Sequence, residues 1–482
     1  MRESGRRVLV AMVVLFLFGS LALWGCGIAQ QEETKEETTE SVETASASND
    51  QQKEEEAAPS EVASLEFYDP KGDYDLQQVV VLSRHNIRAP LSNNGSALAE
   101  ASSHQWIDWT ANGSELTSRG GALETMNGEY FRKWLEHEEL APENWQPSEG
   151  AVRFYANAKQ RTQATARYFA SGLLPVADVD VEMHVEYDTM DPVFNPQITY
   201  LSDAYKEAAL AQVIELHGNA GMEGIAADLA DSYKLIADVC GYTESKGYKD
   251  GTYTDLVTND TDIVYEVGAE PAMTGSLKTA CQISDALVLQ YYETSNAKDA
   301  AFGADLTEDE WKLISKSKDE YGDVLFSAPL VAVNVAHPLL TEIGSELDAE
   351  GREFTFLCGH DSNIASVLAA LGVKEYELPG SIEADTPIGC KLVFEKWTNA
   401  NGEQFGRVRL VYQSAEQLRR GSMVSGYEAP MSVDLDFEDV KKNADGLFVY
   451  DDLRALIADA TDAYDELPAT YGEAEEELDQ AA

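Results

Sequence analysis

The sequence predicts an α/β fold with a central mixed β-sheet flanked by helices and a mostly helical insertion. Two short β-branched and apolar runs, 77–82 and 354–358, are long enough for buried strands and too short for helices. Another such run at 152–155 precedes a helical segment near 160–170, and the run at 354–358 leads into a helix in the same way. Helical periodicity dominates the stretch between these units, from about 200 to 326.

A predicted hairpin makes the sheet mixed. The runs at 390–396 and 407–412 flank an Asn-Ala-Asn-Gly turn at 399–402, which is typical of two antiparallel strands. The first three predicted strands each end directly before charged or polar residues. We expect their ends to meet at one rim, where open α/β sheets bind ligands.

The length of the chain bears on its domain organisation. At 482 residues it exceeds the usual size of one domain, so we expect one large domain or two closely joined ones. The α/β domain is expected in two parts, 65–199 and 327–465, separated by the helical domain at 200–326. An acidic tail is expected at 466–482.

The N-terminal segment reads as a targeting signal. Within 1–26, three arginines in the first seven residues precede an apolar run at 8–24, and the Leu-Trp-Gly-Cys sequence ending at Cys26 resembles a bacterial lipobox. We expect lipid attachment at Cys26, with an uncleaved anchor as the alternative. The stretch 27–64 has almost no large apolar residue and predicts an acidic, disordered tether. The remainder is therefore expected outside the cytoplasmic membrane, either lipid-anchored or in the periplasm or at the cell surface.

The net charge of −51 limits the classes of partner. Such a surface repels nucleic acid, so we expect no nucleic-acid partner. The same field disfavours the approach of any anionic ligand, so a site for one needs arginines concentrated around it.

Cysteine and histidine spacing predicts no metal site, because neither C-x-x-C nor H-E-x-x-H occurs, and we expect no cofactor. Apart from Cys26, the cysteines are Cys240, Cys281, Cys358 and Cys390. They allow three disulfide pairings, and the sequence does not choose among them. Cys358 and Cys390 lie in or beside predicted core strands, where a free buried thiol is as compatible with the sequence as a bridge.

Two segments carry the chemistry. Ser-Arg-His-Asn-Ile-Arg-Ala-Pro at 83–90 and Gly-His-Asp-Ser-Asn at 359–363 each follow a predicted strand. Together they supply two histidines, two arginines and one carboxylate. This set suits phosphoryl transfer through a covalent phosphohistidine.

The chain resembles the histidine acid phosphatases, the second branch of the histidine phosphatase superfamily, which includes phytases. Within that family it is most similar to the bacterial glucose-1-phosphatase branch. The resemblance runs from about 76 to 420 and is thinnest between 200 and 269. The segments that carry it are 83–91, 93–96, 116–117 with 120–121, 155–157, 160–162 with 164–166, 189–192 with 194–196, 359–366, 386–389 and 412–419.

The resemblance implies roles for individual residues and a phosphoglycerate-mutase-like sheet with an inserted cap domain. His85 would be the nucleophile. The planar donors of Arg84, Arg88 and Arg161 would bind phosphate oxygens, with His360 as a further donor. Asp361 would protonate the departing alcohol and then activate water, which requires its protonated form at acidic pH. The substrate would lie between the cap and the sheet.

Each assignment has a structural alternative. His360 and Asp361 stand before a predicted helix and could be only an N-cap pair. Arg161 could be a surface charge on its helix. A lone histidine at a strand end is usually structural, but Arg84 and Arg88 on either side favour a functional His85.

Substrate choice rests on three further residues. Asn86 and Leu91 resemble the glucose-1-phosphatase branch, and Glu270 aligns loosely with a carboxylate of that branch that faces the sugar. The sequence therefore favours hydrolysis of small sugar phosphates. The alternatives are a phytase, acting on inositol hexakisphosphate, and a lipid-anchored protein that binds a phosphosugar without cleaving it.

Overall fold

The computed structural model describes residues 67, 69–91, 100–218, 220–257, 261–421 and 428–474. All of them belong to one compact unit, 61–482. The predicted signal segment at 1–26, the tether at 27–64, Cys26 and the motif at 93–96 lie outside the described residues.

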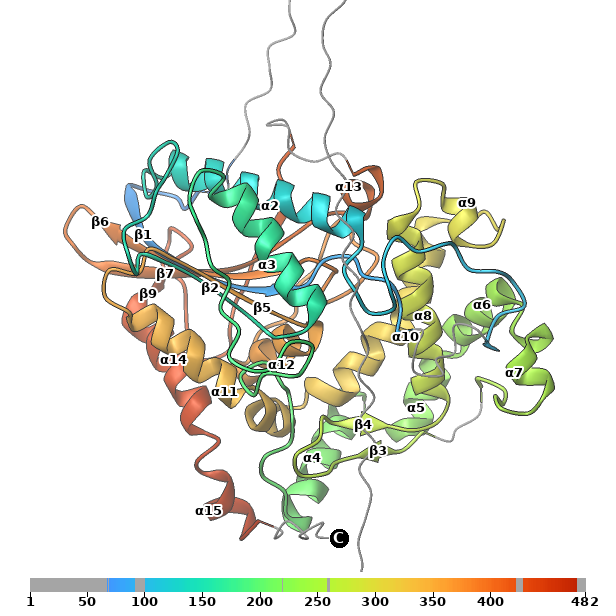
Figure 1. Cartoon of the computed structure of the whole chain (residues 1–482). Coiled ribbons are helices and arrows are strands. Elements are labelled where there is room, and N and C mark those ends of the chain that lie inside the picture. The colour runs from blue at the N-terminus through green and yellow to red at the C-terminus, as the bar shows by residue number, and fades with distance from the viewer. Residues whose placement is uncertain are drawn as a thin grey trace, which may run out of the picture. The chain divides into compact units, whose positions relative to one another are not determined.

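A seven-stranded mixed sheet forms the centre of this unit, as predicted (Figure 1). Strand β1 (Tyr74–Arg84) lies between a parallel neighbour and an antiparallel one, with β2, β5, β1, β6, β7 and β8 in that spatial order and β9 paired to β7. The predicted hairpin is confirmed as β6 and β7. The other strands are β2 (Val152–Ala156), β5 (Phe354–Gly359), β6 (Lys391–Asn399), β7 (Gln404–Tyr412), β8 (Met431–Asp434) and β9 (Phe448–Val449).

Helices cover both faces of the sheet because its central strands are apolar on both sides. In β1, Val79 and Val81 pack toward α2 (Ser118–His137) and α3 (Gln160–Leu173). The alternating residues, Val80 and Leu82, belong to the core shared with the helices on the opposite face. Those helices are α11 (Pro329–Asp348), α12 (Asp361–Ala370) and α14 (Tyr450–Asp462), and Figure 1 shows the two groups on opposite sides.

The helical domain has a core of its own, in which Tyr205, Tyr233, Ile283 and Trp311 are buried. It contains a small two-stranded sheet, β3 with β4, besides its helices. Its elements are α4 (Asp203–Leu216), α5 (Gly221–Asp228), α6 (Ala230–Cys240), a 3₁₀ turn (Tyr242–Glu244), α7 (Lys246–Lys249), β3 (Ile263–Val264), β4 (Ala272–Met273), α8 (Ser276–Glu293), α9 (Ala297–Ala300) and α10 (Glu308–Phe326).

The last part of the described chain packs onto the fold. Helix α13 (Ala415–Arg420) follows β7, and α15 (Leu467–Tyr471) lies within the predicted acidic tail. The side chains of Ser202 and Tyr200 donate to the carbonyl groups of Tyr471 and Gly472, at 2.9 and 2.7 Å. The first part of the predicted acidic tail is therefore a packed helix, in which Leu467 is buried against the helical domain.

Two properties of the described residues bear on the remaining sequence predictions. The four cysteines that the structure describes are free, so none of the three possible pairings occurs among them. No single helix in the described ranges is long and apolar enough to cross a membrane, although α10 and α11, which meet at 83°, pass that test as a pair.

Helices α2 and α3 touch through their backbones at two glycines. A Cβ atom on Gly128 would lie 2.1 Å from the carbonyl oxygen of Phe169, and one on Gly172 would lie 2.0 Å from that of Thr125. Only glycine allows this approach. The contact sets the distance between α2 and the helix that carries Arg161.

We expect Gly172→Ala to lower the free energy of unfolding by about 1–3 kcal/mol or more, because the added methyl group forces two helix backbones apart. Urea denaturation of the compact unit 61–482 measures the change. Gly322→Ala is the matched control, since a Cβ at that helical position has open space and alanine raises helix propensity by up to about 1 kcal/mol. Equal effects of the two substitutions would contradict the close packing of α2 on α3.

Candidate active site

The ends of three parallel strands meet at one rim of the sheet. Arg84, the last residue of β1, is in register with Gly359 of β5, and Ala156 of β2 is in register with Cys358. His85 follows β1 directly, and His360 follows β5 as the N-cap of α12. The loop after β2 leads into α3, which carries Arg161. The common register explains why segments far apart in the sequence share one site.

His85 is buried, and one of its ring nitrogens is occupied. Its Nδ1 lies 2.9 Å from the main-chain carbonyl oxygen of Asn86. A carbonyl only accepts, so Nδ1 carries the proton and Nε2 carries the lone pair. Burial lowers the pKa of His85 well below its usual value, and the charges of Arg161 and His360 lower it further. The ring is therefore a neutral nucleophile with a defined attacking atom.

A neighbouring asparagine sets the tautomer of His360. The Oδ1 atom of Asn157 accepts from the main-chain N–H groups of Ala158 and Asp191, at 2.8 and 2.9 Å. The amide nitrogen of Asn157 must then face His360 and donate to its Nε2, at 2.8 Å. The proton of a neutral His360 is thereby assigned to Nδ1, so Nδ1 and Nη2 of Arg161, 3.3 Å apart, are both donors and do not hydrogen-bond to each other.

Donors therefore converge beside His85. The His85 and His360 rings lie 5.5 Å apart between centroids and meet edge to face. Burial, reinforced by the charge of Arg88, lowers the pKa of Arg161 to about 10. The Nε atoms of Arg84 and Arg161 have no hydrogen-bond partner among the residues that the structure describes. This is the arrangement that a tetrahedral oxyanion needs.

Arg84 lies between two carboxylates. Its Nη2 lies 3.1 Å from Oδ2 of Asp361, and its Nη1 lies 2.7 Å from Oε1 of Glu383. Asp361, the first residue of α12, has a side chain that is 42% exposed. Partial loss of hydration acts to raise the pKa of Asp361, but the positive charges around it, Arg84 first and Lys318 next, together outweigh that effect and hold the pKa well below its usual value. Asp361 is accordingly ionised in the free site.

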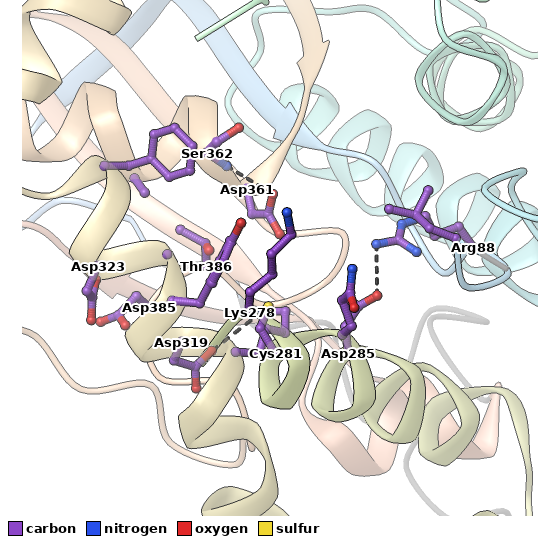
Figure 2. A pocket seen from close by; sticks show the side chains of 17 residues that line it. Arg88, Lys278, Cys281, Asp285, Asp319, Asp323, Asp361, Ser362, Asp385 and Thr386 are labelled. Atoms are coloured by element: carbon purple, nitrogen blue, oxygen red, sulfur yellow. Dashed lines mark hydrogen bonds and ion pairs between the residues drawn. The ribbon is translucent and has the colours of Figure 1, made fainter. Parts of the chain in front are cut away.

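A cavity of about 260 Å³ adjoins these groups (Figure 2). Arg88 reaches its wall and lies 3.0 Å from Asp285 of α8, so its charge is already paired. The walls come from α8 and α10 on one side and from α12 and the loop before β6 on the other. The lining residues include Arg88, Leu91, Lys278, Cys281, Asp285, Lys318, Asp319, Asp323, Asp361, Ser362, Asp385 and Thr386.

The three predicted specificity residues differ in their position relative to the cavity. Leu91 lines the cavity and is 43% exposed. Glu270 is exposed and does not line the cavity, and partial loss of hydration together with the charge of Asp361 raises its pKa. Asn86 does not reach the cavity. It is fully buried, its Nδ2 donates to Glu124 at 2.8 Å and its Oδ1 accepts from the N–H group of Ile87.

Residues without an assigned role in the sequence prediction complete the site. Asn157 lies in the Tyr-Ala-Asn segment that carries part of the resemblance, and this was the only available signal for it. Asp285 and Glu383 belong to no motif, although they pair with Arg88 and Arg84. Beneath His85, the buried ion pair between Glu124 and Lys391, at 2.9 Å, anchors Asn86.

Comparison with known proteins decides the family. A model of the histidine phosphatase superfamily, branch 2, matches residues 75–213. The chain is 38% identical to glucose-1-phosphatase of Salmonella typhimurium over 381 residues. This alignment covers 78% of this chain and 90% of that protein. The chain belongs to the histidine phosphatase superfamily, branch 2. It is a phosphoric monoester hydrolase, and the predicted family is confirmed.

Further relatives agree with this assignment. The glucose-1-phosphatase of Providencia rettgeri is 37% identical over 398 residues, or 81% of this chain and 93% of that protein. The structure of Hafnia alvei phytase without ligand is similar with a TM-score of 0.74 at 25% identity, and it covers 82% of this chain and 99% of that one. The likeness confirms the predicted fold. An enzyme of this family is not the non-catalytic binding protein that the sequence left as an alternative.

Proposed function

We propose that this phosphatase hydrolyses small sugar phosphates, in the manner of a glucose-1-phosphatase, through a phosphohistidine at His85. The observation that carries the proposal is the Nε2 lone pair of His85, held among donors of Arg84, Arg161 and His360. A phosphoryl group bound by those donors would lie in front of the attacking nitrogen. Asp361 and the cavity lie on the side where the alcohol would leave.

The reaction takes two displacements. His85 Nε2 attacks phosphorus, the bond from phosphorus to the ester oxygen breaks, and Asp361 gives its proton to that oxygen. Water then attacks the phosphohistidine and gives a proton to Asp361, the bond from nitrogen to phosphorus breaks, and inorganic phosphate leaves with His85 restored. The arginines stabilise the charge on the equatorial oxygens in both steps.

The ionised state of Asp361 in the free site accounts for a preference for acidic conditions. Arg84 keeps that carboxylate charged, so its proton has to arrive with the substrate. A phosphate monoester in its monoanionic form carries one proton, and this form predominates below a pKa of about 6. A bound phosphoryl group also competes for the charge of Arg84, which raises the pKa of Asp361 toward its usual range.

We expect His85→Ala to abolish turnover while the protein stays folded, because no neighbouring group supplies an attacking nitrogen in the same place. Rapid denaturation during turnover of a ³²P-labelled ester should trap acid-labile label on His85 of the unsubstituted protein. Far-ultraviolet circular dichroism serves as the folding control. Label on a serine or an aspartate would overturn the mechanism.

The charges of the cavity support a singly phosphorylated substrate. Two of its three lining cations, Arg88 and Lys318, are already paired, with Asp285 and Glu383 respectively, and Lys278 is the third. Asp323 and Asp385 also line it, and burial raises their pKa values to about 6 and about 7. At acidic pH these two side chains are largely protonated, so they exchange hydrogen bonds with hydroxyls and add no positive charge that would bind a second phosphate group. Phytase remains the alternative, favoured by the similarity of the solved phytases, such as that of Hafnia alvei.

Glu270→Lys should raise the kcat/KM for phytate relative to that for glucose 1-phosphate, because it places a cation where a carboxyl group now interacts with Asp361 and Arg161. The two values are measured for both proteins at acidic pH. Glu266→Lys, the same charge change at another exposed position of this segment, is the control. A higher kcat/KM for phytate than for any sugar monophosphate in the unsubstituted enzyme would move the protein to the phytase group.

We also propose that the enzyme is extracytoplasmic and attached to the membrane through Cys26. The support is the sequence pattern of 1–26 and the acidic composition of 27–64, which suits a solvated tether. Cells that express the full chain are grown with radiolabelled palmitate and fractionated. The enzyme should be found in the membrane fraction and should carry the palmitate label. Cys26→Ser should lose the label. Retention of activity in the cytoplasm would contradict the proposal.

A further inference from the structure

We infer that Glu383 is a positioning residue through which the helical domain holds Arg84 in place and sets the proton affinity of the catalytic acid. The inference rests on the proposed function, in which Asp361 protonates the leaving group. Glu383 itself does not reach the reacting atoms. It acts through Arg84, which it contacts from the side opposite Asp361.

Every oxygen of the Glu383 carboxylate is used. Its Oε1 lies 2.7 Å from Nη1 of Arg84 and 2.9 Å from Nζ of Lys318. Its Oε2 accepts from the hydroxyl of Tyr292 at 3.2 Å and from the main-chain N–H group of Ile388 at 2.8 Å. The residue is 2% exposed, so these contacts are shielded from water.

The donors come from separate parts of the fold. Arg84 ends β1, Lys318 lies on α10, and Tyr292 lies on α8. The main chain at Glu383 is held by Ser381, whose hydroxyl accepts from the Glu383 N–H group at 3.1 Å and donates to its carbonyl oxygen at 2.7 Å. Glu383 therefore joins two helices of the helical domain to the guanidinium at the rim of the sheet.

Removing the charge of Glu383 would change the balance around Asp361. Arg84 and Lys318 are then left with Asp361 and with Asp319, whose Oδ1 lies 3.5 Å from Nζ of Lys318. Asp361 would face an excess of positive charge and hold a proton less readily. The charged and titratable groups that act on Asp361 are Arg84, Lys318, His85 and His360, and it interacts in turn with Arg161 and Glu270.

Glu383→Gln, which keeps the shape and removes the charge, tests the inference. We measure kcat/KM for glucose 1-phosphate and for p-nitrophenyl phosphate across the acidic and neutral range. Loss of one further pKa unit at Asp361 makes its protonated form about tenfold rarer. The decrease in kcat/KM should therefore be about tenfold greater for glucose 1-phosphate, which has the poorer leaving group. The pH profile should move to lower pH. Equal losses on both substrates with an unchanged profile would make Glu383 merely structural.

Glu395→Gln is the matched control. Glu395 is also a buried carboxylate that pairs with an arginine, Arg409, but this pair joins β6 to β7 within the sheet. Its substitution should lower stability and leave the ratio of the two substrates unchanged. If Glu383→Gln does not fold, Lys318→Met is used instead, and the expected shift of the pH profile is in the opposite direction. Removal of that cation should move the pH profile to higher pH, and a shift to lower pH would overturn the inference.

Asp361→Asn separates this inference from the proposed mechanism. If Asp361→Asn selectively slows glucose 1-phosphate and Glu383→Gln does not, the acid assignment stands and the role of Glu383 falls. If Asp361→Asn slows both substrates by the same factor, Asp361 is not the proton donor, and both fall. Glu383→Asp, which keeps the charge, should restore most of the substrate ratio.

Discussion

Burial of positive charge at one rim of the sheet is the constraint on which the site depends. An ion removed from water loses solvation worth several kcal/mol, and an opposite charge close to it offsets that loss. The fold supplies such partners for most of these cations: Glu383 for Arg84, Asp285 for Arg88 and Glu124 for Lys391. Arg161 has no carboxylate at salt-bridge distance within the described part of the chain. Its unmatched charge marks the position where an anion lowers the energy of the whole cluster.

Sequence reasoning captured the features that are local in the chain. Short apolar runs followed by charged residues were sufficient to locate β1, β2 and β5 and the common rim at which they end. The same runs placed His85, Arg161 and His360 on three strand or helix ends. Parallel pairing then brings these residues together, because the carboxyl ends of neighbouring parallel strands lie at the same edge of the sheet.

The partners that tune the site could not be predicted in this way. Arg84 and Glu383 are separated by 299 positions, and Arg88 and Asp285 by 197, so each pair exists only through tertiary packing. Asn86 illustrates the opposite case. The resemblance implies a role for it in substrate choice, whereas its side chain is buried and donates to Glu124. A motif gives the identity of a residue but not the side to which it points.

The backbone contact between Gly128 and Gly172 has a consequence for protein engineering. Replacement of helical glycines by alanine is a common route to higher thermal stability. Here that strategy would push α3 away from α2 and carry Arg161 with it. A displacement of even 1 Å in a phosphate ligand is costly for catalysis. Stabilised variants of this enzyme are therefore better sought on the exposed faces of the helical domain, where added side chains do not alter the spacing of the catalytic groups.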